Sequence, residues 1–544
     1  MKPHRISSSA KVLTLVWVAT ALPAPLVGAF LALDLYWAIN LATNLVLALG
    51  ALWFFREFYQ KARHELFTAY RKFVGYGVVV GYCLVNIASL EWASEAMWVI
   101  SAIQGLVGWL AWLCLRVKTT ELHYGYAPPP KGTKKPFLGA VVENIDVLAQ
   151  TIFLVIVLQQ LLFQLYVIPS ESMVPTLLKA DRPFVIKSLD GPSIPMSNHQ
   201  LPVLSGVNRG QIIVFETPVY DEPPVITQMI QKLVFFLTLS TVNLDVDASG
   251  NPKVQFVVKR VTGVPGEKLM MVDDQLYTKT ATSPAWSPVE VDKTYRHVDL
   301  WKEDTELQKR ITTFPIQKDV RELMTKLDEL KNTTDPETLR TKLASEVATL
   351  AAKLASNLGK AGVPSVERLN GVVNSGLPTQ PVGNSPESLL AALAAPPPLA
   401  ENVTLYEKSA RLVNLFHKSL LAERYLALLD NQPTEFTALL QQAKEWEYYL
   451  LQYFDMRNFP EFPTGEGSFI PEGKYFLMGD NRYNSLDFRF DALSKFVSRA
   501  LDASDPTSTV YTSMLAPRLL DRSRIIGHLA FRIWPLDRLG LVKP

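Results

Sequence analysis

Apolar runs dominate the first 167 residues, whereas the rest of the chain alternates apolar and polar positions as a water-exposed protein does. A helix needs about twenty mainly apolar residues to cross the hydrocarbon core of a bilayer. Five runs approach this length, namely 12–31, 35–55, 74–90, 97–115 and 147–167. The pattern therefore predicts five membrane-spanning helices.

Basic residues in the predicted loops indicate the direction of these spans. Lysine and arginine cluster before the first run, after the second and after the fourth, while the opposite loops carry acids or little charge. Because basic loops stay on the cytoplasmic side, the three clusters predict a cytoplasmic N-terminus. An odd number of spans then places everything after Val167 outside the cell membrane.

Short runs rich in β-branched and aromatic residues follow the last span, with glycine and proline between them, and this pattern is typical of strands. The clearest runs are 184–189, 211–216, 254–261, 269–277, 474–479 and 525–534. They predict an all-β domain that begins at Ile168 and ends near Leu541. A further apolar run, 231–242, is too short to span a bilayer. It is interpreted as a buried strand, with an apolar tip at the membrane surface as the alternative.

The pattern changes to helical spacing between about residues 302 and 459. Apolar residues recur every three or four positions from Leu339 to Leu358, after a helix-start signal at Asp335 and Pro336. A stretch rich in proline, glycine and serine separates these helices from two more. The predicted domains are a four-span region (1–140), a fifth span (141–167), a β domain in two parts (168–301 and 460–544) and a helical insertion between them (302–459). The separating stretch is 376–398, and the later helices are predicted at 399–429 and 433–453.

Composition and charge exclude several classes of protein. The two cysteines, Cys83 and Cys114, lie inside apolar runs, so the outer part has no disulfide framework. No HExxH motif or Cys/His spacing occurs, so no metal site is predicted. A net charge of +2 gives no indication of a nucleic-acid partner.

Three short clusters in the outer part could carry chemistry. They are IPSESMVPTLL (168–178), VVKRVTGVPGE (257–267) and FLMGDNRYNSLDFR (476–489). Each has an ordinary interpretation when taken alone: a capped turn, a charge that guards an edge strand, and a β-turn. Together they favour catalysis, because a serine needs a base and no histidine stands in a suggestive context. Lysine can serve if burial lowers its pKa, and Lys259 follows three apolar residues.

The order and the residues of these clusters resemble the motifs of bacterial signal peptidase I, a family of Ser/Lys proteases that mature exported proteins. Two further segments agree with the resemblance, NRGQIIVFETP (208–218) and RIIGHLAFRIWPLDRLG (524–540). The resemblance implies that Ser172 is the nucleophile and Lys259 its general base. It implies that the Ser170 hydroxyl and the Ser172 amide form an oxyanion hole, and that Ser485 orients the lysine amine.

The resemblance also implies roles for residues around the dyad. Four charged residues would brace the site: Arg260, Asp480, Asp487 and Arg489. Five others would line shallow pockets that favour Ala-x-Ala before the cut: Ile168, Pro169, Met173, Leu177 and Val258. The chain departs from the family pattern in four places. Glu171 stands where many members have glycine, Tyr483 replaces a common aspartate, Phe488 replaces a small residue, and the run 490–523 is unusually long.

We therefore expect a multi-pass serine endopeptidase of the bacterial inner membrane whose catalytic domain faces the extracytoplasmic side. The resemblance implies no cofactor and no nucleic-acid partner. Its expected partners are exported preproteins, the lipid bilayer and the secretion machinery. Two alternatives are a non-catalytic protein that holds signal helices and a self-cleaving regulator. The presence of both Ser172 and Lys259 argues against a non-catalytic protein. The lack of a DNA-binding module argues against a self-cleaving regulator.

Overall fold

The computed structural model describes residues 162–192, 202–218, 256–491 with short gaps and 496–542, together with a few isolated positions. The chain divides into two compact units, and the second contains nearly all of these residues. The second unit consists of the segments 163–191, 203–220 and 254–544. In the described part of the chain no helix has both the length and the apolar character to cross a bilayer. The first four predicted spans, apart from two isolated positions, lie outside the described residues.

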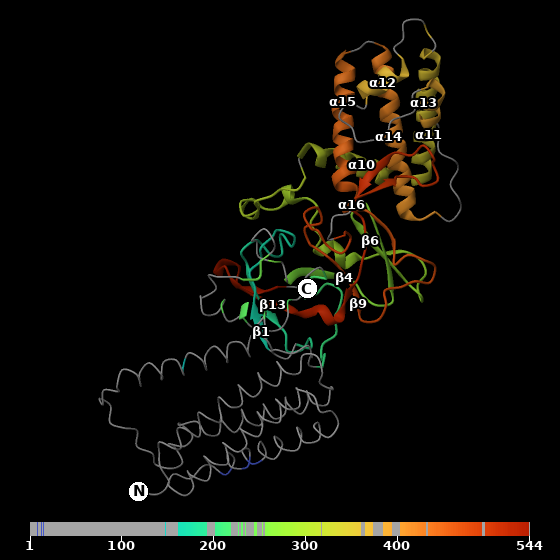
Figure 1. Ribbon diagram of the computed structural model, residues 1–544. Coiled ribbons are helices and arrows are strands. Elements are labelled where there is room, and N and C mark those ends of the chain that lie inside the picture. Colours follow the sequence, from blue (N-terminus) through green and yellow to red (C-terminus); the bar gives the residue numbers. More distant parts are fainter. Residues whose placement is uncertain are drawn as a thin grey trace, which may run out of the picture. The chain divides into compact units, whose positions relative to one another are not determined.

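An antiparallel sheet of eight strands forms the main body of this unit (Figure 1). Its order is β1-β2-β13-β3-β4-β9-β12, with β14 also paired to β13. The late strand β13 therefore lies between β2 and β3, which brings the C-terminal part of the sequence beside the start of the domain. The strands are β1 (Phe163–Leu165), β2 (Arg182–Ile186), β3 (Ile212–Glu216), β4 (Phe256–Gly263), β9 (Lys474–Met478), β12 (Leu520–Asp521), β13 (Ile525–Trp534) and β14 (Gly540–Leu541).

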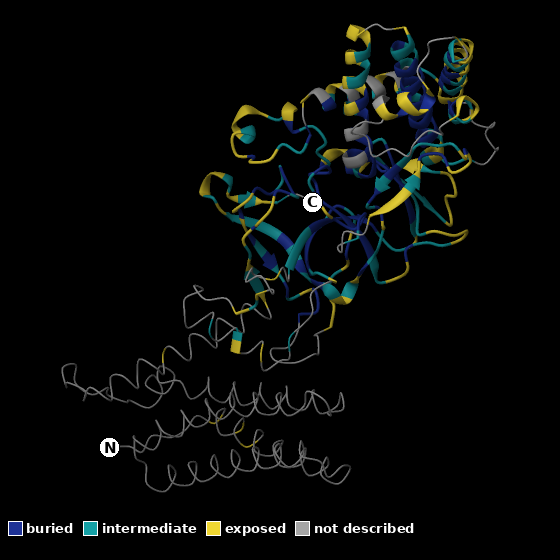
Figure 2. Cartoon of the chain, turned by 45° about the horizontal axis from the view of Figure 1, so that its top comes forward, coloured by how far each residue is buried: buried dark blue, intermediate teal, exposed yellow. Residues whose placement is uncertain are grey.

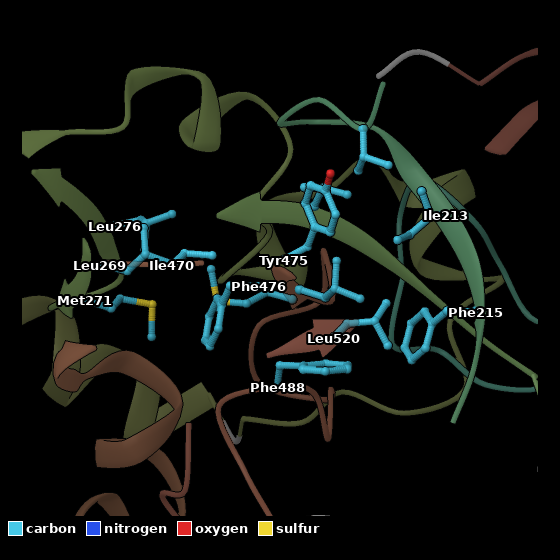
Figure 3. Close-up of a cluster of buried hydrophobic side chains, with 14 of the residues drawn as sticks. Ile213, Phe215, Leu269, Met271, Leu276, Ile470, Tyr475, Phe476, Phe488 and Leu520 are labelled. Atoms are coloured by element: carbon cyan, nitrogen blue, oxygen red, sulfur yellow. The ribbon is translucent and has the colours of Figure 1, made fainter. Parts of the chain in front are cut away.

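A second, four-stranded sheet has the order β7-β6-β5-β8. Its strands are β5 (Glu267–Val272), β6 (Gln275–Thr280), β7 (Ser287–Pro288) and β8 (Phe459–Phe462). Asp273 and Asp274 join β5 to β6 with positive φ angles of 48° and 68°, as a two-residue hairpin turn requires. Apolar side chains of both sheets meet in one core, which Figure 3 shows from Ile213 and Phe215 on β3 to Leu269 and Met271 on β5.

All six runs that the sequence predicts as strands contain a strand, which confirms the mostly β character of the domain. Two expectations are wrong. The C-terminal end of the fifth predicted span is wrong, because Phe163–Leu165 pair with β2 as strand β1, while residues 148–161 of this span lie outside the described residues. The strand interpretation of 231–242 fails at Gln231 and Val234, the described residues of that run, which are helical. A short apolar run does not by itself distinguish strand from helix.

Helices occupy most of the described chain between β7 and β8 (Figure 1). α11 begins at Pro336 after an Asp335 cap, as predicted, and buries Leu339, Leu343 and Val347 on one face. α14 packs between α11 and α15 and buries residues on most of its circumference. The helices are α9 (Thr305–Gln308), α10 (Lys318–Thr333), α11 (Pro336–Asn357), α12 (Val366–Val373), α13 (Pro386–Leu393), α14 (Leu405–Leu429), α15 (Pro433–Tyr448) and α16 (Phe454–Arg457). A π-helical turn, Tyr449–Tyr453, joins α15 to α16.

Two segments of this region differ from the sequence pattern. The stretch 376–398, expected only to separate helices, contains α13, whose Leu389 and Leu393 are buried against α14 and its neighbours. The long run 490–523 contains the hairpin of β10 (Val497–Ala500) and β11 (Val510–Ser513). The loop of this hairpin contacts α14 through a buried ion pair of 2.5 Å between Lys418 and Asp505. Figure 2 shows buried residues both in the sheets and along the helices.

Strand β13 approaches strand β2 closely at Gly527. A Cβ at Gly527 would overlap the carbonyl oxygen of Ile186 and lie 2.9 Å from a methyl carbon of Val185. We expect Gly527→Ala to lower the free energy of unfolding by roughly 1–3 kcal/mol, the range for overpacking a filled site. Thermal unfolding of the purified chain measures the change.

A matched glycine provides the control for this substitution. Gly371 lies in α12, and a Cβ there meets no atom within 4 Å. Gly371→Ala is expected to raise stability by about 0.5–1 kcal/mol, because alanine loses less backbone freedom in a helix. Equal stability of Gly527→Ala and the wild type would contradict the close strand approach.

Candidate active site

The structure places the first and second chemistry clusters in direct contact. Lys259, on β4, has its Nζ 2.5 Å from the Oγ of Ser172. Ser172 is partly buried in the turn that follows β1 and Ile168, while Lys259 is buried. A lysine amine and a serine hydroxyl 87 residues apart in sequence thus lie within hydrogen-bonding distance.

Strand geometry explains why the Lys259 side chain is shielded from water. Side chains two residues apart on a strand share a face, so Lys259 projects on the same face as Val257 and Val261. Across the ladder its partner on β3 is Ile213, which is fully buried. Val261, Ile213 and Val257 all pack in the core between the two sheets.

This burial lowers the pKa of Lys259 from its ordinary value to about 8. Loss of hydration disfavours the charged ammonium, and it is the largest cause of the shift. The carboxylates of Asp487 and Asp480 partly oppose it, since their negative charge favours the ammonium, while the Arg489 guanidinium lowers the pKa further. The amine is therefore neutral in an appreciable fraction of molecules near neutral pH.

Ser172 is held by the third cluster through two hydrogen bonds to its own turn. The backbone N–H of Asn481 donates to the Ser172 carbonyl at 3.2 Å, and the Asn481 side-chain amide donates to the Glu171 carbonyl at 3.1 Å. Ser170 is exposed, and its hydroxyl lies 3.4 Å from the Ser172 hydroxyl. Ser170 thus stands beside the proposed reacting atom.

Ser485 is near these residues but makes a different contact from the one expected. Its hydroxyl is buried and has no hydrogen-bond partner among the described residues, so it does not bind the Lys259 amine. Instead it packs against Gly479, where any Cβ would collide with both the Ser485 hydroxyl and the Ser172 carbonyl. The absence of a side chain at Gly479 therefore allows the backbone of the third cluster to pack against the Ser172 carbonyl.

Arg260, the residue after Lys259 on β4, forms a buried bidentate ion pair with Asp480. The Arg260 Nε and Nη2 each donate to one Asp480 oxygen at 2.7 Å, and Nη1 donates to the Gly210 carbonyl at 2.6 Å. The Thr176 hydroxyl donates to the same carboxylate at 2.6 Å. One pair of charges thus connects the turn of Ser172, strand β4 and the third cluster.

Asp487 and Arg489 form the second buried pair. Arg489 donates from Nε at 2.8 Å and from Nη2 at 2.9 Å, and the neighbouring guanidinium holds the pKa of the Asp487 carboxyl below its usual value against the effect of burial. The backbone N–H of Gly479 donates to Asp487 at 2.9 Å. This pair fixes the shape of the third cluster near Lys259.

Four of the five residues expected to line the substrate pockets lie in one apolar cluster. Ile168, Met173 and Leu177 are buried there, and Val258 packs against them from β4. Pro169 is exposed and lies outside this cluster. The cluster adjoins the turn of Ser172 and consists mainly of aliphatic side chains, with Met173 and the aromatic rings of Tyr166 and Phe256.

Sequence reasoning missed two arginines that hold the turn of Ser172. Arg532 Nη1 donates to the Thr176 carbonyl at 2.9 Å, and Arg538 Nη2 donates to the carbonyls of Pro175 and Thr176 at 3.1 and 3.2 Å. Both belong to the last of the similar segments, RIIGHLAFRIWPLDRLG. Their position in a segment that resembles the family was the one feature of the sequence that could have indicated their role. The described residues include no group of three or more metal-ligating side chains.

Comparison with known families identifies the class of this protein. Residues 141–328 and 423–534 match the family described as signal peptidase, peptidase S26. These ranges cover more than half of the chain and include all three chemistry clusters, so the chain belongs to this family. The resemblance to signal peptidase I is confirmed, and the protein is a peptidase that cleaves signal peptides from preproteins. No curated protein matches the chain.

The contribution of the buried Arg260–Asp480 pair to stability can be tested directly. Asp480→Asn removes the carboxylate and leaves the Arg260 guanidinium buried without a counter-charge. We expect the free energy of unfolding to fall by about 3–5 kcal/mol, the usual effect of breaking one partner of a buried pair. Glu290→Gln breaks the exposed pair with Lys293 and serves as control, with an expected loss below about 1 kcal/mol. Chemical unfolding that gave equal losses would contradict the bracing role.

Proposed function

We propose that this signal peptidase is a serine endopeptidase in which Ser172 is the nucleophile and Lys259 the general base. The observation that carries the proposal is the 2.5 Å separation of the Ser172 Oγ and the Lys259 Nζ. Burial that lowers the pKa of the lysine supports it, because only a neutral amine can accept the serine proton.

The proposed reaction has two stages. Neutral Lys259 accepts the hydroxyl proton while Ser172 Oγ bonds to the carbonyl carbon of the scissile peptide. The Ser170 hydroxyl and the Ser172 amide stabilise the resulting oxyanion. As the C–N bond breaks, the ammonium of Lys259 returns its proton to the leaving amine, which frees the mature protein. Lys259 then activates a water that hydrolyses the acyl-enzyme and releases the signal peptide.

We propose that the apolar cluster around Ile168, Met173 and Leu177 sets a preference for small residues before the cut. The cluster is apolar and adjoins the turn of Ser172, which supports a site for small apolar side chains beside the reacting atom. The five apolar runs of the N-terminal part would anchor the enzyme in the bacterial inner membrane, with the catalytic domain on the extracytoplasmic side. A signal helix in the same bilayer would then present its cleavage site to Ser172.

The nucleophile and base are tested by cleavage of a preprotein with an Ala-x-Ala site, by the full chain in detergent or liposomes. Ser172→Ala and Lys259→Met should each lower the rate at least about a thousandfold, because the residues of such a catalytic unit act together. Mass spectrometry of the products locates the cut. Normal cleavage by Ser172→Ala would mean that another residue is the nucleophile.

The pH dependence of kcat/KM tests the base independently. Lys259 must be neutral, and its pKa is about 8, so the rate should rise about tenfold per pH unit below this value and level off above it. Lys259→Arg, whose guanidinium stays protonated, should be inactive throughout. A profile that is flat from pH 6 to 9 would exclude Lys259 as the base.

A further inference from the structure

Glu171, which stands where many family members have glycine, makes a set of contacts across a long sequence distance. Its carboxylate accepts hydrogen bonds from the Thr312 backbone N–H at 2.7 Å, the Thr312 hydroxyl at 2.8 Å and the Thr313 backbone N–H at 3.0 Å. The residue is only 6% exposed. Three donors to one buried carboxylate form a strong, directional contact, since hydrogen bonds to charged groups exceed neutral ones in strength.

The donors belong to the first part of the predicted helical insertion, before its long helices. This segment, 300–316, precedes α10 and is itself ordered by internal contacts. Trp301 stacks on Phe314 with ring centres 4.2 Å apart, and its indole N–H donates to the Ile316 carbonyl at 3.0 Å. The Tyr453 hydroxyl, from the turn after α15, donates to the Pro315 carbonyl. Thr312 and Thr313 are therefore held in a preformed loop.

An apolar contact adds to the same junction. Val174 and Leu178, on the turn that carries Ser172, pack with Leu300 and Ile311 of the segment. The same turn is also bound by Asn481, which donates to the carbonyls of Glu171 and Ser172. The peptide between Glu171 and Ser172 is thus fixed by both the third chemistry cluster and the insertion segment.

We propose that Glu171 is a positioning residue, whose carboxylate clamps the turn of Ser172 to the segment 300–316 and so fixes the direction of the Ser172 hydroxyl. A glycine at this position has no side chain that could reach the segment. The helical insertion thereby takes part in ordering the nucleophile. This inference rests on the proposed role of Ser172.

Kinetics of Glu171→Gln in the full chain test the clamp. Glutamine keeps the size of the side chain but replaces one acceptor oxygen with an NH2 group that faces an N–H donor. We expect kcat, per folded enzyme, to fall about tenfold, in keeping with the loss of a hydrogen bond to a charged group. KM should stay within about twofold of the wild type, because the substrate pockets are untouched. A merely structural role would lower the melting temperature and leave kcat of the folded enzyme unchanged.

Two further variants sharpen the test. Thr312→Val removes one of the three donors and should lower kcat about threefold, and its effect should largely disappear in the Glu171→Gln background because the two residues form one contact. Glu461→Gln is the matched control: its carboxylate binds Lys268 and Lys279 in the second sheet, so its loss should leave kcat unchanged.

The outcomes separate this inference from the proposed function. If Ser172→Ala is inactive while Glu171→Gln and Thr312→Val both retain the wild-type kcat, the clamp is refuted and the nucleophile stands. If Ser172→Ala cleaves normally, both proposals fall. Should Glu171→Gln not fold, Thr312→Val decides alone, and an unchanged kcat would refute the clamp.

Discussion

The buried amine of Lys259 is the constraint on which the rest of the site depends. A pKa lowered from 10.5 to about 8 means that the environment disfavours the ammonium by about 3 kcal/mol. Ile213, Val257 and Val261 impose this cost because they share the face of the sheet on which Lys259 lies. The Lys259 amine stays buried only if the surrounding residues cannot move to let water reach it. The neighbouring ion pairs, Arg260–Asp480 and Asp487–Arg489, hold these residues in place.

The two ion pairs act on different parts of the site. Arg260 follows Lys259 on β4 and projects to the opposite face, where it binds Asp480 and so fixes the strand against the third cluster. Asp487 binds Arg489 and the Gly479 amide, which shapes the same cluster from within. Their carboxylates also keep the lysine pKa from falling further. The two ion pairs thus fix the positions of β4 and the third cluster, and their carboxylates also influence the pKa of Lys259.

The local pattern of β-branched and aromatic residues was sufficient to predict the strands. The proximity of Ser172 and Lys259 was expected from the resemblance of the short clusters to signal peptidase I. Sequence reasoning failed where a contact joins distant segments. The partner of Glu171 lies 141 residues away, and a hydrogen bond to backbone N–H groups leaves no mark in the sequence. The Ser485 hydroxyl was expected at Lys259, yet its position depends on how closely Gly479 approaches Ser172. Helix α13 was missed because its two buried leucines lie within a proline-rich stretch.

Four features that the resemblance predicts to be unusual, namely Glu171, Tyr483, Phe488 and the run 490–523, all make contacts across long sequence distances. Glu171 binds the segment that leads into the helices, and the Tyr483 hydroxyl donates to Asp274, which also pairs with Arg457 of α16. Phe488 packs under the guanidinium of Arg518, from the long run 490–523, and the hairpin of that run binds α14. Each of these residues therefore contacts a segment that is distant from it in the sequence. The insertion and the altered clusters form one packed structure, so a change in the helices has a direct route of contacts to the turn of Ser172.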